Sequence, residues 1–408
     1  MNRLVLIGNG FDLAHGLKTS YADFIYWYWE YRRNHLTEEL TLKVSEDLLC
    51  RLECLEYETW LMAFMYDMEL KYSEGTDVYN YIINSDKIKK EFSPFFERIQ
   101  NSIETKGWVD IENEYYDLLK KYVQGDAPES DIEELHKQLN YLQEKLVEYL
   151  CQIDISDKIK TDIRQKIYGP FETPDISVEG WHALEKHIKY GLELDEREWN
   201  RKLRQYGSDC YSIGWVDDYR KKYGKDVIIE KDLPHELLLP NQIMLLNFNY
   251  TNTVQKYCKE GAIFTVNQIH GNLKNPLSVI FGYGDELDEN FKTLLSKNDN
   301  KLLCNIKSIK YLEADNYRRL LSFIESEPYQ IVIMGHSCGN SDRTLLNTLF
   351  EHKNCVSIKP YYYLKDDGTD NYIELIQNIS RNFTDMKLMR DRVVNKTYCE
   401  PLTNRNNN

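Results

Sequence analysis

Short apolar runs that end in glycine or in polar residues recur along this chain. The first covers residues 4–7 and leads directly into Gly8, Asn9 and Gly10. Runs of this length predict buried strands, and glycines directly after a run predict a tight turn. Similar runs occupy residues 243–249, 263–271, 277–282, 329–335 and 356–364.

Segments with the apolar spacing of helices separate the later runs. Predicted helices cover residues 251–257, a stretch that ends near residue 325, and residues 341–352 and 372–381. Strands that alternate with helices predict a mostly parallel, Rossmann-like α/β sheet covered on both faces. Ligands bind such sheets at the carboxyl ends of the strands, so we expect the functional site there.

A long block without strand-like runs interrupts this pattern. Residues 25–239 are rich in Glu, Lys, Leu and Tyr, and their apolar spacing predicts about eight helices. A crossover between parallel strands needs only about a dozen residues, so this block is predicted to form an all-α insertion subdomain. The α/β domain then comprises residues 1–24 and 240–395, and the polar residues 396–408 are predicted to be disordered.

The first turn has the features of a phosphate-binding strand–turn–helix. Gly8 and Gly10 lack a Cβ atom, so a ligand could approach the backbone amides at the start of the next helix. The motif is incomplete, because Leu13 stands at the position of the third glycine, and Ala14 and His15 follow it. A turn that binds nothing, with His15 capping it, is the alternative.

The net charge, the cysteine pattern and the lengths of the apolar runs exclude several classes of protein. The net charge of -15 disfavours a nucleic-acid binder, because phosphate backbones need a basic surface. The nine cysteines are scattered without a C-x-x-C motif, which indicates a reducing compartment and no metal site. No run has the length of a membrane span and the first residues do not resemble a signal peptide, so we expect a cytoplasmic protein.

Five short motifs follow the predicted strands in a fixed order. They are GNGFD at residues 8–12, NFNYT at 247–251, HG at 270–271, VIFG at 279–282 and GHS at 335–337. This series resembles the sirtuin-like NAD-binding fold, whose members carry G-A-G-x-S, T-Q-N-x-D, H-G, V-x-F-G-E and G-T-S.

The chain resembles the AbiH family of bacterial abortive-infection proteins more closely still. The resemblance spans most of the chain and is carried by GNGFDL at residues 8–13, TSY at 19–21, Phe24, WVDIE at 108–112, FNYT at 248–251, IHG at 269–271, FGY at 281–283, GHS at 335–337 and Asp342. It implies phage defence. The sirtuin-like core implies NAD as the ligand and, by analogy with other sirtuin-like defence effectors, NAD hydrolysis.

The chain also departs from the sirtuin pattern. Sirtuin deacetylases insert a four-cysteine zinc module after the His-Gly motif, whereas only residues 272–275 separate Gly271 from Pro276 here. Protein deacylation is therefore not expected. Thr251 stands where that family has Asp, and Asp12 where it has Ser.

The resemblance assigns roles to residues of these motifs. His270 would be the base for water, Asn249 would orient the ribose or the water, and Asp12 would stabilise positive charge or bind the nicotinamide side. The remaining predicted NAD-binding residues are Gly8, Asn9, Gly10, Phe11, Thr251, Gly335, His336, Ser337 and Asp342.

Each role has a structural alternative. His270 could be a hydrogen-bonded structural residue, with His336 as the base in its place. Asn249 could cap the helix that begins near residue 251. Carboxylates of the block at residues 110–114 could reach the site or lie solvated on a helix face.

These observations predict an antiphage effector that hydrolyses NAD⁺ to nicotinamide and ADP-ribose. A nucleotide-binding sensor that acts through a partner without turnover is the alternative, and a nuclease is disfavoured by the charge. Because NAD loss is toxic, we expect regulation by self-association or by a partner protein. The tyrosine-rich insertion is the expected surface for that contact.

Overall fold

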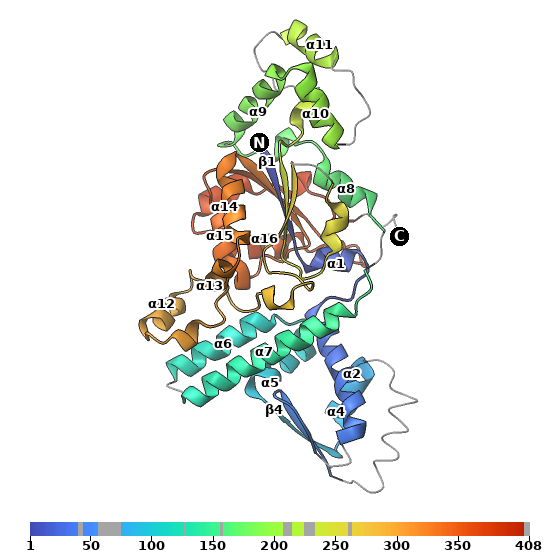
Figure 1. The fold of residues 1–408 in the computed structure, drawn as a ribbon, viewed down its shortest axis with the longest axis vertical. Helices are drawn as coiled ribbons and strands as arrows, with labels where there is room; N and C mark the ends of the chain where they lie inside the picture. The colour runs from blue at the N-terminus through green and yellow to red at the C-terminus, as the bar shows by residue number, and fades with distance from the viewer. Residues whose placement is uncertain are drawn as a thin grey trace. The chain divides into compact units, whose positions relative to one another are not determined.

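The computed structural model describes residues 1–39, 44–55, 75–125, 128–155, 158–206, 214–223, 233–259 and 263–403 (Figure 1). The chain forms two compact units, each built from separate segments. The sheet unit comprises Met1–Leu17, Ile155–Ile280 and Ser308–Asn408. The helical unit comprises Lys18–Asp154 and Phe281–Lys307.

The sheet unit contains the predicted parallel sheet. Its five strands have the order β6-β5-β1-β7-β8, so the first strand of the chain is the central one. All four pairings are parallel, and Val5 of β1 lies opposite Leu245 of β5 and Val332 of β7. The strands are β1 (Asn2–Ile7), β5 (Ile243–Asn247), β6 (Phe264–Gln268), β7 (Tyr329–Met334) and β8 (Cys355–Tyr361).

The strand predicted at residues 277–282 is absent from the described sheet, and that prediction is wrong. Pro276–Ser278 form a 3₁₀ turn, η5, and the following residues continue as a buried loop. The amide of Ile280 donates to His270 O at 3.0 Å, and its carbonyl accepts from the Tyr250 hydroxyl at 3.0 Å. The apolar run therefore records burial of a loop rather than pairing of a strand.

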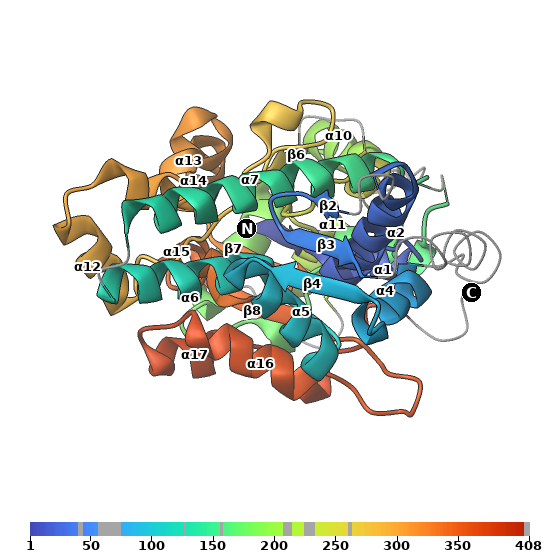
Figure 2. The ribbon, with the colours of Figure 1, turned by 90° about the horizontal axis from the view of Figure 1, so that it is seen from below.

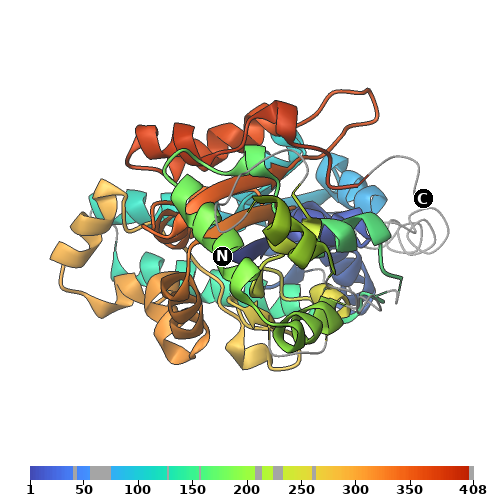
Figure 3. The same ribbon diagram turned by 90° about the horizontal axis from the view of Figure 1, so that it is seen from above.

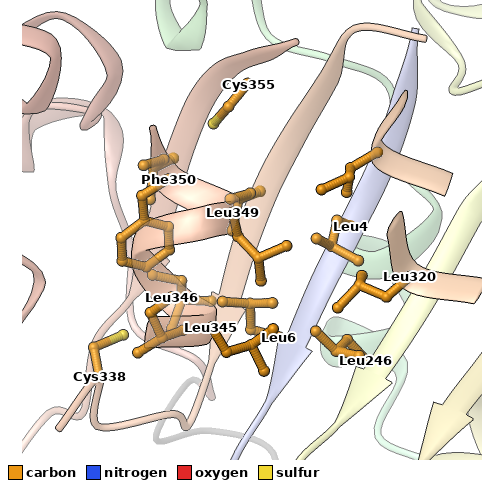
Figure 4. Close-up of a cluster of buried hydrophobic side chains, with 14 of the residues drawn as sticks. Leu4, Leu6, Leu246, Leu320, Cys338, Leu345, Leu346, Leu349, Phe350 and Cys355 are labelled. Carbon is orange, nitrogen blue, oxygen red and sulfur yellow. The ribbon is translucent and has the colours of Figure 1, made fainter. Parts of the chain in front are cut away.

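Helices cover both faces of the sheet, because both faces of its strands are apolar. Leu4 and Leu6 of β1 pack on one face with a cluster from four helices (Figures 1 and 4). Val5 and Ile7 pack on the other face with a second cluster. The first group of helices is α14 (Asn316–Ser326), α15 (Arg343–Phe350), α16 (Tyr372–Arg381) and α17 (Met386–Arg392), and the second is α1 (Asn9–Ala14), α8 (Thr161–Tyr168) and η4 (Thr253–Tyr257).

A third apolar cluster joins residues of the predicted insertion to the amino ends of the strands. Leu184, Ile188 and Leu237 pack there with Met1 and Val356, and Figure 3 shows the green helices gathered beside the residue marked N. Residues 155–239 thus belong to the sheet unit and not to an insertion covering residues 25–239. Their elements are η2 (Thr173–Asp175), α9 (Trp181–Glu193), α10 (Glu196–Tyr206), α11 (Gly214–Tyr223) and η3 (His235–Leu238).

The helical unit is mostly helical, as predicted for this part of the chain, but it also holds an antiparallel sheet (Figure 2). Its strands, in the order β2-β3-β4, are β2 (Val44–Glu46), β3 (Cys50–Cys54) and β4 (Ile88–Phe92). These strands have five residues or fewer, too short for their alternation to stand out in sequence. The helices are α2 (Tyr21–Glu39), α4 (Gly75–Asn84), α5 (Pro94–Lys106), α6 (Ile111–Gln124), α7 (Glu129–Cys151), α12 (Glu289–Ser296) and η6 (Asn300–Leu303).

Glu112 explains why residues 281–307, predicted to lie in the α/β domain, pack in the helical unit instead. Its buried carboxylate accepts from the amide of Gly282 at 2.9 Å and from Lys307 Nζ at 2.8 Å. Both side chains of this ion pair are almost fully buried. The ring of Tyr283 also stacks on Tyr116 with centroids 3.8 Å apart. Lys307 opens the short helix α13 (Lys307–Lys310), which η7 (Tyr311–Glu313) follows.

The end of the chain is ordered up to residue 403, so the prediction of disorder is wrong for residues 396–403. Lys396–Tyr398 form the 3₁₀ turn η9, and Leu402 is buried. The amide of Leu402 donates to Tyr362 O at 2.9 Å, which extends the pairing beside β8. Residues 404–408 lie outside the described part. Within the described residues, no helix combines the length and apolarity that crossing a membrane requires.

Candidate functional site

The predicted site residues all lie in the sheet unit, in the loops and the short helix α1 that follow the carboxyl ends of the strands. Asp12 follows β1, Asn249 and Thr251 follow β5, and His270 follows β6. Gly335 and the residues up to Asp342 follow β7, where Asn340–Asp342 form the turn η8. Polar contacts link these residues into two groups, centred on Asp12 and on Asp342.

The first group surrounds the carboxylate of Asp12, which is only 1% exposed. Thr251 donates its hydroxyl to Asp12 Oδ2 at 2.5 Å. The other carboxylate oxygen, Oδ1, is buried and accepts no hydrogen bond from the described residues. Burial raises the pKa of Asp12, and the neighbouring polar side chains of Thr251, Thr253 and Asn249 oppose that shift. An unpartnered buried acceptor of this kind is suited to a ligand that donates a hydrogen bond.

Asn249 links the loop after β5 to the turn after β1. Its Nδ2 donates to Gly8 O at 3.0 Å. The alternative that Asn249 caps the following helix is wrong, because η4 begins after Asn252 and has no side-chain cap. Asn249 therefore holds two adjacent strand ends together.

Asn247, the last residue of β5, begins the NFNYT motif at residues 247–251, and the sequence predicted no role for it. Its buried amide donates to the carbonyl oxygens of Asn249 and Thr251 at 3.0 and 3.1 Å, and to Gln268 Oε1 at 2.6 Å. Its Oδ1 accepts from the amide of Asn249 at 3.2 Å. Asn247 thus fixes the shape of the loop that presents Asn249 and Thr251. An asparagine that ends an apolar strand was the available signal for this role.

The glycine turn after β1 differs from the predicted phosphate cradle. The amide of Gly8 donates to Met334 O at 3.2 Å, that of Gly10 to Gly335 O at 2.8 Å, and that of Phe11 to Gly8 O at 2.9 Å. These three amides therefore already have acceptors within the protein, which corrects the phosphate-binding role expected of them. Asn9 lies exposed between them.

The glycines serve instead the close approach of two turns. A Cβ atom on Gly8 would lie 2.4 Å from the Cα atom of His336. Gly335 has a φ of +74°, and a Cβ atom there would lie 2.1 Å from the amide nitrogen of Phe11. The side chain of Phe11 packs on Tyr257, with ring centroids 5.4 Å apart. This contact between the loops after β1 and β7 explains why both loops carry glycine.

The second group is centred on Asp342, whose two carboxylate oxygens contact two imidazoles. His270 Nε2 lies 3.2 Å from Asp342 Oδ1, and His336 Nε2 lies 3.6 Å from Asp342 Oδ2. The ring of Phe248 meets both imidazoles edge to face, with centroids 5.2 Å from His270 and 4.2 Å from His336. The loops after β6 and β7 thus bring three predicted site residues together.

The contact with Asp342 favours one tautomer of His270. An ionised carboxylate only accepts hydrogen bonds, so with Asp342 ionised the favoured tautomer has the hydrogen on Nε2 and the basic lone pair on Nδ1. Tyr311, which the sequence placed only in a helical stretch, lies with its hydroxyl 3.1 Å from the same Nε2. Its ring stacks on His270 with centroids 6.1 Å apart. No local pattern marks Tyr311, because its role depends on contacts distant in sequence.

Other candidate residues have structural contacts. Ser337 is exposed, and its carbonyl accepts from Asn378 Nδ2 at 2.9 Å. His15 caps the end of α1, which agrees with the structural alternative for this turn, and its Nδ1 lies 2.7 Å from Phe11 O. Asp110 caps α6 by accepting from the amide of Asn113 at 3.0 Å. Glu114 of the same block pairs with Arg98 at 2.7 Å.

The architecture and the two groups of polar contacts define an α/β protein with a polar, largely buried site at the carboxyl edge of a parallel sheet. Residues 4–363 match the family described as Bacteriophage abortive infection AbiH. Because this match covers most of the chain, the protein belongs to the AbiH family, and this membership supports a role in antiphage defence. Neither a curated protein nor a solved structure matches the chain.

Proposed function

We propose that this AbiH protein acts in defence by hydrolysing NAD⁺ to nicotinamide and ADP-ribose at the carboxyl edge of its sheet. One observation carries the proposal: the imidazole of His270 is held by the carboxylate of Asp342 at 3.2 Å, in the loops where such sheets bind ligands. A carboxylate that orients an imidazole is the usual arrangement around a histidine base. The ordered sirtuin-like motifs support NAD as the substrate.

The reaction breaks the bond between the nicotinamide nitrogen and the ribose carbon. The electron pair of that bond goes to the nicotinamide ring, which leaves neutral, while the ribose acquires oxocarbenium character. Water forms the new bond to the ribose carbon and gives a proton to His270, which later releases it to solvent. Asp342 stabilises the imidazolium that forms, because its carboxylate lies 3.2 Å from Nε2, the opposite ring nitrogen.

The first group of residues would bind the nicotinamide side and the ribose. Asp12 Oδ1 is the acceptor for a carboxamide N–H of the substrate, since it is buried and unpartnered among the described residues. Asn249 already donates a hydrogen bond through Nδ2 to Gly8 O, so it would accept one from a ribose hydroxyl through Oδ1. Because the amides of Gly8 and Gly10 are engaged, Asn9 and Ser337 are the exposed candidates for the phosphates.

The test is release of nicotinamide from NAD⁺ by the purified protein, alone and with phage lysate. His270→Ala and Asn249→Ala should each lower release by about 100-fold or more, as expected for loss of a base or of substrate orientation. His182→Ala is the matched control, because that side chain is 90% exposed and lies 3.6 Å from Glu185, one turn along the same helix. Release by the wild type that neither site variant reduces would contradict the proposed site.

The burial of the site favours a second candidate, a nucleotide-binding sensor. His270 is only 4% exposed and Asp12 1%, which suits slow or regulated access to ligand. A sensor would bind NAD⁺ in a calorimetric titration without releasing nicotinamide under either condition. We also propose that self-association or a regulatory partner uses the helical unit, where the side chain of Trp108 is 57% exposed. Light scattering with and without Trp108→Ala tests self-association there.

A further inference from the structure

The turn that follows His336 has an unusual backbone. Cys338 has a φ of +55°, a region that residues with a side chain rarely occupy. The same residue is fully buried, and its side chain belongs to the apolar cluster that contains Leu345 and Leu346 (Figure 4). Such conformations persist only where the surrounding structure fixes them, so the contacts that hold this turn are informative.

The consequence of this conformation is a hydrogen bond to an imidazole. The amide of Cys338 donates to His336 Nδ1 at 3.0 Å. That contact uses the lone pair of Nδ1, so the hydrogen of neutral His336 lies on Nε2, the nitrogen that faces Asp342 Oδ2. A continuous series of contacts therefore runs from the amide of Cys338 through His336 and Asp342 to His270.

Two asparagines of the α16 region hold the turn from its other side. Asn382, which is fully buried, donates through Nδ2 to Cys338 O at 2.9 Å. Asn378 donates through Nδ2 to Ser337 O at 2.9 Å. The backbone of Asn382 is also held in place, because its carbonyl oxygen accepts a hydrogen bond from Asn347 Nδ2 at 3.0 Å. Both asparagines lie beyond residues 4–363, the part matched to the family.

We propose that Asn382, the Cys338 turn and His336 form a positioning chain that fixes the tautomer of His336 and, through Asp342, the orientation of His270. His336 is a positioning residue in this arrangement and not the base, because its only basic lone pair is occupied by the Cys338 amide. The assignment of a base rests on the proposed NAD⁺ hydrolysis. The tautomer of His336 and the contacts around it do not depend on that proposed function.

The first experiment measures the tautomers directly, without substrate. The full-length protein is labelled with ¹⁵N-histidine, and long-range ¹H–¹⁵N correlation spectra are recorded for the wild type, Asn382→Ala, His336→Asn and Asn354→Ala. His336→Asn assigns the signals of His336 by their loss. Asn354→Ala is the matched control, because Asn354 also donates to backbone carbonyls of the sheet unit, at 2.9 Å to Ile324 O.

We expect the wild-type spectrum to show His336 with hydrogen on Nε2 and not on Nδ1. Asn382→Ala should shift the ¹⁵N signals of His336 and His270 towards a mixture of tautomers, while Asn354→Ala leaves both unchanged. A wild-type His336 with hydrogen on Nδ1 would overturn the proposal. So would a folded Asn382→Ala protein with unchanged histidine signals. If Asn382→Ala does not fold, Asn378→Ala releases the neighbouring carbonyl and takes its place.

A second measurement separates the positioning chain from the proposed function. His336→Asn keeps an acceptor for the Cys338 amide, so it should lower nicotinamide release by about 10- to 100-fold without moving the acid limb of the pH profile. Loss of the acid limb in His336→Asn would make His336 the base and overturn the inference, with NAD⁺ hydrolysis intact. Expected tautomers in a protein that never releases nicotinamide would support the chain and contradict the function.

Discussion

The imidazole of His270 lies 3.2 Å from the carboxylate of Asp342, although the two residues follow strands that are not neighbours in the sheet. His270 follows β6 and Asp342 follows β7, and strands β5 and β1 lie between these two. The loops therefore meet above the ends of the central strands, with the ring of Phe248 against the imidazole. This contact is the basis of the assignment of a base.

Asp342→Asn should remove most of the activity while leaving the fold intact. The amide cannot stabilise an imidazolium, and it can present a hydrogen instead of an acceptor to His270, so nicotinamide release should fall by about 100- to 10,000-fold. The comparison is Asp315→Asn, a surface carboxylate 3.4 Å from Arg319, which should retain wild-type activity. Equal activity in both variants would remove Asp342 from the mechanism.

Gly335→Ala should destabilise the protein far more than Gly368→Ala. Both glycines have positive φ, +74° and +87°, so both substitutions impose the same backbone strain. Only at position 335 would the new Cβ atom meet the backbone, 2.1 Å from the amide nitrogen of Phe11, whereas nothing lies within 4 Å at position 368. We expect losses in the free energy of unfolding of about 3 kcal/mol and about 1 kcal/mol, measured by urea denaturation. Similar losses of unfolding free energy in the two variants would mean that the turns after β1 and β7 can move apart to accommodate the new Cβ atom at little cost.

Asp175 should make stability fall as pH rises from about 4 to about 6. Burial raises the pKa of this carboxyl to about 6, and the bond from Lys359 Nζ at 2.9 Å only partly opposes the shift. The folded state then binds the proton more tightly than the unfolded chain does, so stability is full below the unfolded pKa and is lost as the carboxyl ionises.

Asp175→Asn removes this titration and should become more stable relative to the wild type as pH rises through that window. The relative gain is at most about 3 kcal/mol. Urea denaturation of both proteins at several pH values across the window measures the difference. A constant difference would show that Asp175 titrates alike in both states.

Glu112→Gln should weaken the helical unit by removing the carboxylate that pairs with the buried Lys307 at 2.8 Å. Removing one member of a buried ion pair costs about 3–5 kcal/mol. Glu133→Gln, which breaks an exposed pair with Lys301 at 2.7 Å, should cost less than about 1 kcal/mol. Denaturation followed by tryptophan fluorescence compares the two variants. The double variant Glu112→Gln/Lys307→Met should recover much of the loss, and no recovery would contradict the pairing.

The sequence was informative where short-range patterns dominate. The apolar runs around residues 4–7 and 329–335 are strands, and the helix predicted at residues 372–381 is α16 (Tyr372–Arg381). The strand predicted at residues 277–282 was wrong, because a buried loop and a buried strand give the same apolar pattern in the sequence. The antiparallel strands β2 to β4 were missed, since each is short and alternates over few residues.

The candidate site was predictable only in part. Motif order placed His270 and Asp342 at strand ends, but their contact depends on loops that cross the sheet edge. The glycines at positions 8 and 10 suggested a ligand site. In the structure they instead let the turn at Gly335 and His336 pack against them without a steric clash. Asn382 carries no motif, because its importance arises from one hydrogen bond to Cys338 O. Such long-range contacts leave no periodic signal in a single sequence.

The central position of β1 has a consequence for synthesis on the ribosome. β1 (Asn2–Ile7) is made before both of its neighbours, β5 (Ile243–Asn247) and β7 (Tyr329–Met334), and residues 8–242 separate it from the nearer one. Until they are made, a strand that is apolar on both faces has no partner, and exposed apolar strands invite misassembly. The sheet can therefore be completed only after β7 and β8 (Cys355–Tyr361) have been made.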